Sequence, residues 1–279
     1  MATAVIVLSQ ERERNNTMSD ASNPYESTPA KSLRPLGGIQ YMRSFHYVFE
    51  NPIWITNLLF IGLCILSTSV IPVIGQLVFT GYQFAVIEAL HRRPGAQYLD
   101  FDMNKLLDYL VRGFWIFLVG LVVGLAMLPI IGGIVILFVV LIGGAGAAAG
   151  DDGAAIAMMI VIPILVCVIL VIGIAINMLY VPLMLRAGLM QDFGAAFDFG
   201  FAKQFIRNTW KEMILCALFS MVAAILLMIV GMAMLCVGVY FTMSIAILMQ
   251  AHLVHQLYEL HLARGGDAIP MKPLAASPD

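Results

Sequence analysis

Three long stretches of this chain contain almost no charged side chain, and they constrain the fold more than any motif does. No Lys, Arg, Asp or Glu occurs in residues 51–87 or 213–258, and only Asp151 and Asp152 interrupt residues 113–185. A helix needs about 20 mainly apolar residues to cross a hydrocarbon core of roughly 30 Å. Charged residues make up only 11% of the chain, against about a quarter in a typical soluble domain. We therefore predict an all-α integral membrane protein.

The middle run divides into either two or three spans on hydropathy, and the basic residues decide between them. Three spans would place Lys203 on the opposite side of the membrane from Arg92 and Arg112, against the positive-inside bias. Two spans put all 15 Lys and Arg on one side, with a kink at Pro129 and an outer loop over Gly143–Gly153. The six predicted spans cover about residues 53–70, 72–91, 113–141, 154–180, 211–232 and 234–258.

An internal parallel repeat relates the two ends of this membrane domain. Gly38, Phe45 and Trp54 recur without a gap as Gly194, Phe201 and Trp210, and the register holds as far as Gly75 and Gly231. The chain is thus predicted to form three hairpins. Its tryptophans, Trp54, Trp115 and Trp210, each open one hairpin at the inner interface, where an indole ring is well accommodated.

An amphipathic segment precedes each predicted hairpin. Aromatic residues at intervals of four line one helical face of the first and third segments, while Phe101–Arg112 shows the pattern more weakly. Such helices lie in the headgroup plane. Two interpretations remain: structural elbows that position the hairpins, or helices that sense lipid or generate membrane curvature. The aromatic residues are Tyr41, Phe45 and Phe49 in the first segment and Phe193, Phe197, Phe201 and Phe205 in the third.

The membrane domain is expected to cover residues 37–265. Residues 1–36 are rich in Ser, Asn and Pro and residues 266–279 contain three prolines, so both tails are predicted to be disordered. The distribution of basic residues places both termini in the cytoplasm.

The motif Phe45-x3-Phe49-x2-Pro52-x-Trp54, followed by an apolar run that ends at Pro72 and Gly75, resembles the bacterial multi-pass membrane family known as domain of unknown function 4013. It is also distantly similar to the membrane domain attached to some glycerophosphodiester phosphodiesterases. The resemblance implies a bacterial cytoplasmic (inner) membrane protein, and no substrate, cofactor or catalytic residue. The positions assigned to the structural motif are Phe45, Phe49, Pro52, Trp54, Pro72, Gly75, Trp115, Phe201, Phe205, Trp210 and Gly231.

Ionisable residues near the apolar runs are the candidates for a site. Glu88 is a possible intramembrane polar site, although a pair with Arg92 one helical turn away also explains it. His252, His255 and Glu259 share a helical face and are residue types that bind divalent metals. Hydrogen-bonded or snorkelling side chains are the alternative explanation, and we predict no bound metal or cofactor.

Uncharged polar residues within the spans could line a hydrophilic path or join helices by hydrogen bonds. No motif of a hydrolase, kinase or nucleotide-binding loop is present, and a net charge of −2 argues against a nucleic-acid partner. We expect a non-enzymatic scaffold, accessory or lipid-interacting component whose partners are the lipid bilayer and other membrane proteins. The alternative is a small-solute transporter or permease. The polar residues are Asn57, Gln76, Gln83, Asn177, Ser220, Thr242, Ser244 and Gln250.

Overall fold

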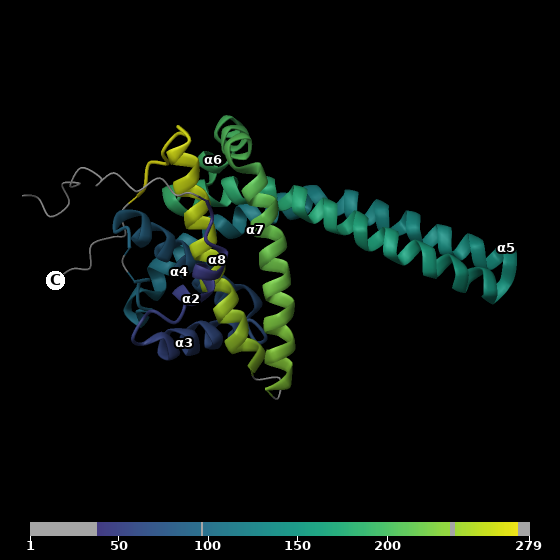
Figure 1. Cartoon of the computed structure of the whole chain (residues 1–279), viewed down its shortest axis with the longest axis horizontal. Coiled ribbons are helices and arrows are strands. Elements are labelled where there is room, and N and C mark those ends of the chain that lie inside the picture. The colour runs from purple at the N-terminus through teal and green to yellow at the C-terminus, as the bar shows by residue number, and fades with distance from the viewer. Residues whose placement is uncertain (1–37, 96, 235–237, 273–279) are drawn as a thin grey trace, which may run out of the picture. The chain divides into compact units, whose positions relative to one another are not determined.

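The computed structural model describes residues 38–95, 97–234 and 238–272. Every regular element in these ranges is helical, and none is a strand (Figure 1). The predicted tail over residues 1–36 lies outside the described residues, as does the end of the C-terminal tail. The elements are α2 (Tyr41–Tyr47), α3 (Trp54–Ser67), α4 (Pro72–Arg92), η1 (Met103–Lys105), α5 (Leu106–Met190), α6 (Phe193–Ala196), α7 (Phe199–Ala233) and α8 (Gly238–Ala263).

Five helical segments in the described part of the chain are long and apolar enough to cross a membrane. They are α4, the segments Met103–Ala148 and Ala155–Met190 that make up most of α5, α7 and α8. The sixth apolar helix, α3, has only 14 residues, or about 21 Å at 1.5 Å per residue. That length is shorter than the hydrocarbon core, which agrees with the small size of the first predicted hairpin.

The predicted outer loop over Gly143–Gly153 is wrong, because α5 stays helical through most of that segment. Its backbone leaves the helical region only at Gly150, with φ 68° and ψ −160°. Alanine is the strongest helix former, and a helix satisfies its own backbone polar groups where water is absent. The predicted kink at Pro129 does not interrupt the helical φ/ψ angles either. We call the segments before and after Gly150 the outgoing arm and the return arm.

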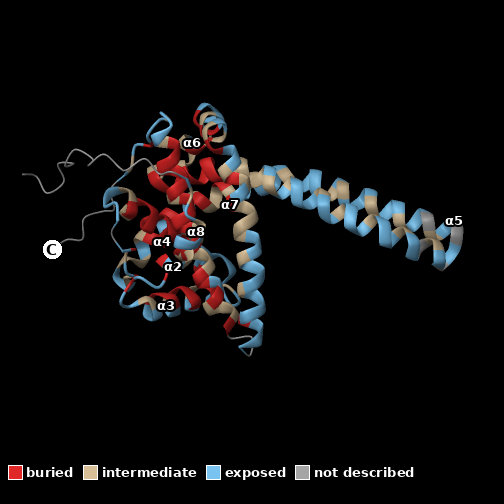
Figure 2. Cartoon of the chain, viewed as in Figure 1, coloured by how far each residue is buried: buried red, intermediate tan, exposed pale blue. Residues whose placement is uncertain are grey.

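Glycines allow α4 and α5 to cross in backbone contact. A Cβ atom on Gly81 would lie 1.8 Å from the carbonyl oxygen of Tyr109, and one on Gly113 would lie 1.9 Å from that of Leu77. Neither position leaves room for a methyl group. Helices in membranes associate through such small residues, which let their backbones approach closely. Around this crossing α4, α8 and both ends of α5 form the buried core (Figure 2).

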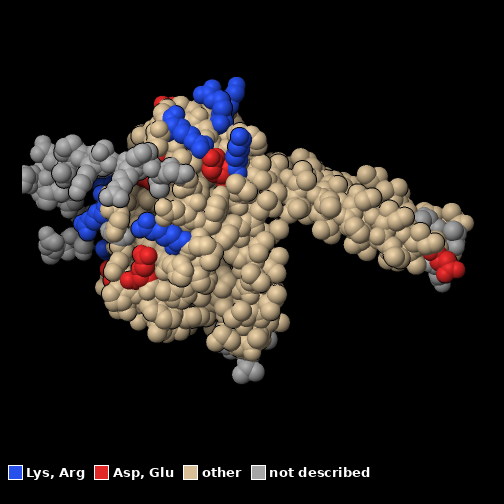
Figure 3. All heavy atoms as spheres, viewed as in Figure 1, with Lys and Arg blue, Asp and Glu red and all other residues tan. Residues whose placement is uncertain are grey.

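The distal parts of the two arms of α5 lie outside that core. The most apolar window of each arm contains no buried residue, and both arms are exposed or half-exposed along most of their length in Figure 2. Their surface carries almost no charge until the turn beside Gly150, as Figure 3 shows. Such a surface requires lipid or protein around it.

The third amphipathic segment does not form the single interfacial helix that its aromatic pattern predicts. The chain turns at Phe197 and Asp198, and the Asp198 carboxylate accepts a hydrogen bond from the backbone N–H of Phe201 to cap α7. Phe201 and Phe205 then point into the protein and pack on the ring of His261. With Phe205 fully buried at 0% exposure, these two rings form part of the core and do not face lipid.

The first amphipathic segment is also shorter than predicted. α2 has only seven residues and ends before Phe49. Phe45 contacts Phe49, whose ring in turn contacts Trp54 at a centroid distance of 5.2 Å. Pro52 lies in the exposed turn before α3. The aromatic residues therefore form a chain of edge contacts around this turn.

The repeat-related residues occupy related but unequal places. Trp54 begins α3, whereas Trp210 lies inside α7 and is exposed. Gly75 follows Pro72, which opens α4, and packs on the end of α3; Gly231 precedes its own turn and packs on the start of α8. Both glycines thus permit a tight hairpin, from opposite sides of the turn.

The C-terminal tail does not begin at residue 266 as predicted. The backbone N–H of Ile269 donates to the Tyr258 hydroxyl, and that of Lys272 donates to the carbonyl of Leu189. Ile269 is buried. The residues after α8 therefore fold back over the ends of α5 and α8.

Candidate functional site

Buried charges gather where the ends of α4, α5 and α8 meet. Glu88 on α4 is 3% exposed and binds two arginines. One carboxylate oxygen lies 2.7 Å from Arg92 and the other 2.5 Å from Arg112, whose side chain is 0% exposed. The pair with Arg92 is the one that the sequence predicts. The pair with Arg112, which joins α4 to α5, was missed, because Arg112 reads in the sequence as part of the polar face of an interfacial helix.

The arginine side of this cluster is incompletely bonded. The Nε and Nη1 groups of Arg112 are buried and have no hydrogen-bond partner among the described residues. Within the described ranges, Glu88 is the only acidic group paired with this fully buried guanidinium. The Glu88 carboxylate holds an arginine of α5 as well as one of its own helix, so the geometry favours a structural role for Glu88 in joining α4 to α5.

The predicted group of His252, His255 and Glu259 divides into two separate contacts. Glu259 accepts a bond from Nδ1 of His91 on α4, at 2.5 Å, and lies 3.5 Å from Nε2 of His255. His252 points elsewhere: its Nδ1 lies 2.9 Å from the Ser44 hydroxyl, and its ring stacks on Tyr47. The three side chains therefore do not converge on one point.

No group of three metal-ligating side chains is found among the described residues. His91 is the residue that sequence reasoning missed here. Its only signal was a Leu-His pair near the end of each repeat copy, Leu90-His91 and Leu260-His261, yet the two histidines differ in surroundings. His91 joins α4 to α8, whereas His261 packs against Phe201 and Phe205. The contact between His91 and Glu259 therefore links α4 to α8 at the end of the core.

A separate polar contact fixes the loop before η1. Asn51 and Asn57 both donate to the carboxylate of Asp100, at 2.7 and 3.2 Å. The Tyr98 hydroxyl donates to the carbonyl of Val48, and burial raises the pKa of Tyr98 to about 12, so the phenol stays protonated. Asn57, one of the residues predicted to line a polar path, is thus occupied in holding this loop.

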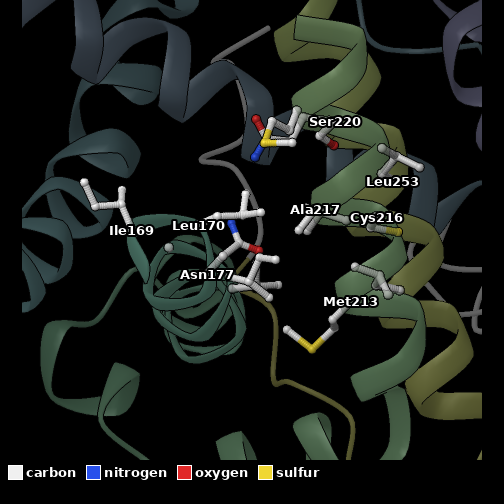
Figure 4. A pocket seen from close by; sticks show the side chains of 15 residues that line it. Ile169, Leu170, Asn177, Met213, Cys216, Ala217, Ser220 and Leu253 are labelled. Atoms are coloured by element: carbon white, nitrogen blue, oxygen red, sulfur yellow. The ribbon is translucent and has the colours of Figure 1, made fainter. Parts of the chain in front are cut away.

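Three other polar residues that were predicted to line a hydrophilic path lie around one pocket. Asn177 on α5, Ser220 on α7 and Gln250 on α8 line a pocket of about 350 Å³ between these helices (Figure 4). In that view Asn177 extends from α5 toward α7, across from Cys216 and Ala217. The remaining wall is apolar.

The other predicted polar residues have separate surroundings. The hydroxyls of Thr242 and Ser244 bond to carbonyls of their own helix. Gln83 is buried, and Gln76 lines a second pocket of about 650 Å³ between α4 and α5. One continuous path through all eight residues is therefore not formed.

These features define a polytopic α-helical membrane protein. It has a cluster of buried charges at one end of its core and a mainly apolar pocket, lined by three polar side chains, between α5, α7 and α8. The chain belongs to the family described as Protein of unknown function (DUF4013), whose model matches residues 64–251. This match confirms the resemblance seen in the sequence. No curated protein and no solved structure matches the chain.

Proposed function

We propose that the protein is a non-enzymatic scaffold or accessory component of a bacterial cytoplasmic membrane, and that it works through the contacts of α5 within the bilayer. The exposure of the two arms of α5 carries this proposal. The ends of α5 are buried in the core, but the distal parts present apolar side chains such as Leu125, Ile136 and Ile160 on the surface.

The glycines of the arms support contact with other helices. A Cβ atom added to Gly124, Gly132, Gly133 or Gly173 would meet nothing within 4 Å, whereas glycines at the crossing of α4 and α5 have no free space. Small residues on membrane helices let a neighbouring backbone approach closely. The arms therefore offer packing surfaces that this chain does not itself use, and a neighbouring membrane protein is the occupant we propose.

The proposed topology has six spans in three hairpins, with both termini in the cytoplasm. Two ion pairs, Arg186 with Asp198 and Arg264 with Glu212, place basic groups near the ends of α5, α7 and α8. At the other end of the arms, Asp152 lies beside the turn of α5. The pairing of α3 with α4 supports the same arrangement. A hairpin in which both α3 and α4 cross returns the chain to the side from which it entered.

Compartment reporters test this topology directly. We expect a reporter at Asp151 to be active only outside the cytoplasm and one at Gln204 only inside it. Activity of both reporters in the same compartment would eliminate the six-span arrangement, because an even number of crossings would then separate the two positions, whereas six spans place one crossing between them.

The docking proposal is tested by filling the open glycines. Gly132→Leu with Gly133→Leu adds bulk at two positions where a Cβ atom would meet no neighbouring group within 4 Å apart from its own helix backbone. We expect unchanged thermal stability and loss of whatever protein copurifies from the native membrane in mild detergent. Val135→Leu, a change of exposed bulk on the same arm, is the control. Equal copurification with the glycine variant and the wild type would refute docking through this part of α5.

A transporter is the second candidate, favoured by the pocket between α5, α7 and α8. Its test is solute flux in reconstituted vesicles. Flux abolished by Asn177→Leu, a substitution in the lining of this pocket, in a protein that remains folded would support transport and overturn the scaffold. If flux is absent and a protein partner is retained, the scaffold is supported.

A further inference from the structure

We infer that the pocket between α5, α7 and α8 binds a neutral lipid whose head carries hydroxyl and carbonyl groups, as a diacylglycerol does. This inference concerns a different surface from the docking arms and does not depend on them. It rests on the polarity, the charge and the shape of the pocket lining.

Three hydrogen-bonding side chains at this pocket lack partners. In the part of the chain that the structure describes, the half-buried side chains of Asn177, Ser220 and Gln250 line this pocket and form no hydrogen bond with another protein group. Other polar residues of the same helices, such as Thr242 and Gln256, are bonded. A polar group in hydrocarbon without a partner is unfavourable by several kcal/mol. A ligand with both donors and acceptors would relieve all three at once.

The chemistry of the lining selects a neutral head. No Lys, Arg, His, Asp or Glu is among the residues that form the pocket. Phosphate groups are recognised by arginine, lysine or clustered backbone N–H groups, so a phospholipid head has no counter-charge here. Amides and a hydroxyl instead match ester carbonyls and a glycerol hydroxyl.

The apolar walls lead from the protein core to the lipid-facing surface. Val181, Met213 and Leu253 are buried at the inner side of the pocket, whereas Ile169 and Met221 are exposed. An acyl chain attached to a bound head could therefore leave between α5 and α7 without crossing a polar barrier. The volume of about 350 Å³ is at the small end of ligand sites, which fits a glycerol head with the first part of its chains.

The test is competitive binding to the full-length protein in detergent, with 1,2-dioleoylglycerol as the probe, followed by native mass spectrometry. We expect saturable binding of the probe that an equal concentration of dioleoylphosphatidylglycerol does not displace. Asn177→Leu with Gln250→Leu should weaken binding roughly tenfold, because each lost hydrogen bond contributes a few-fold in affinity. Gln76→Leu removes an amide from the other pocket and should leave affinity unchanged.

Ser220→Ala gives a reading even where the double variant does not fold, since it removes one hydroxyl and little volume. We expect a few-fold loss of affinity for the probe. Equal affinity of wild type and Ser220→Ala, or displacement of the probe by the charged lipid, would overturn the inference. Neither outcome bears on the docking role of α5, which the glycine variants test separately.

Discussion

The ion pair between Glu88 and Arg112 should stabilise the core asymmetrically. Glu88→Gln leaves a guanidinium that is 0% exposed without a charged partner. Arg112→Met instead leaves Glu88 with Arg92, which is 44% exposed and can bring water with it. Removing one partner of a buried pair costs about 3–5 kcal/mol, while replacing both by apolar groups is often close to neutral.

The expected free energies of unfolding follow from these contacts. Glu88→Gln should lose about 4 kcal/mol, and Arg112→Met about 2 kcal/mol, because its remaining carboxylate keeps one arginine. Combining Glu88→Gln with Arg112→Met should recover part of the free energy that Glu88→Gln alone loses. The assay is reversible unfolding in mixed micelles at increasing mole fraction of sodium dodecyl sulfate, followed by tryptophan fluorescence and circular dichroism.

A double-mutant cycle decides whether the two residues act as a pair. Contact residues show interaction free energies of about 0.5–3 kcal/mol, whereas distant residues add within roughly 0.5 kcal/mol. Additive effects of the two substitutions, each below about 0.5 kcal/mol, would refute the buried pair. Equal losses in the two single variants would refute the supporting role of Arg92 and leave the pair itself intact.

Three further predictions follow from packing and length. Gly81→Ala should destabilise the fold by about 3 kcal/mol, because the added Cβ would lie 1.8 Å from a backbone oxygen. Gly124→Ala, where the added Cβ faces open space, should not destabilise it. Equal denaturation midpoints for the two variants would contradict the close crossing of α4 and α5. Phe205→Ala should lower the free energy of unfolding by about 3–5 kcal/mol in the same micelle assay, whereas Phe199→Ala, at an exposed position, should change it little. A larger loss for Phe199→Ala than for Phe205→Ala would support the original prediction of a helix that lies in the membrane interface. A cysteine at Val70, which is 81% exposed at the tip of the first hairpin, should react with an impermeant maleimide added outside cells; no reaction would mean that this hairpin re-enters without crossing.

The sequence predicted well what depends on composition. Charge-free runs located the apolar helices, because the absence of charge over about 20 residues has few explanations outside a membrane. The breaks at Pro72 and Gly231 were found for a similar reason, since proline favours a helix start and glycine permits close approach. The boundaries of α4 and α8 accordingly agree with the predicted spans within a few residues.

What failed were the predictions about which side of a helix faces which neighbour. A stripe such as Phe201 and Phe205 is apolar whether it faces lipid or protein, so periodicity cannot separate the two. The prediction that Arg112 lies on a solvated helix face failed because of its charge. A charge at the end of a span reads as solvated, and only the fold shows that the close crossing at Gly113 encloses it.

The two kinds of glycine in this chain connect the fold to the proposed function. At Gly81 and Gly113 the backbone of a neighbouring helix occupies the space that a side chain would fill, and the ion pair of Glu88 and Arg112 lies beside the contact. At Gly132 and Gly133 the same small residue faces open space. Glycine within a helix is unfavourable by about 1 kcal/mol relative to alanine, which close packing can offset in the core. On the arms nothing in this chain offsets it, and packing by the helix of a partner would do so.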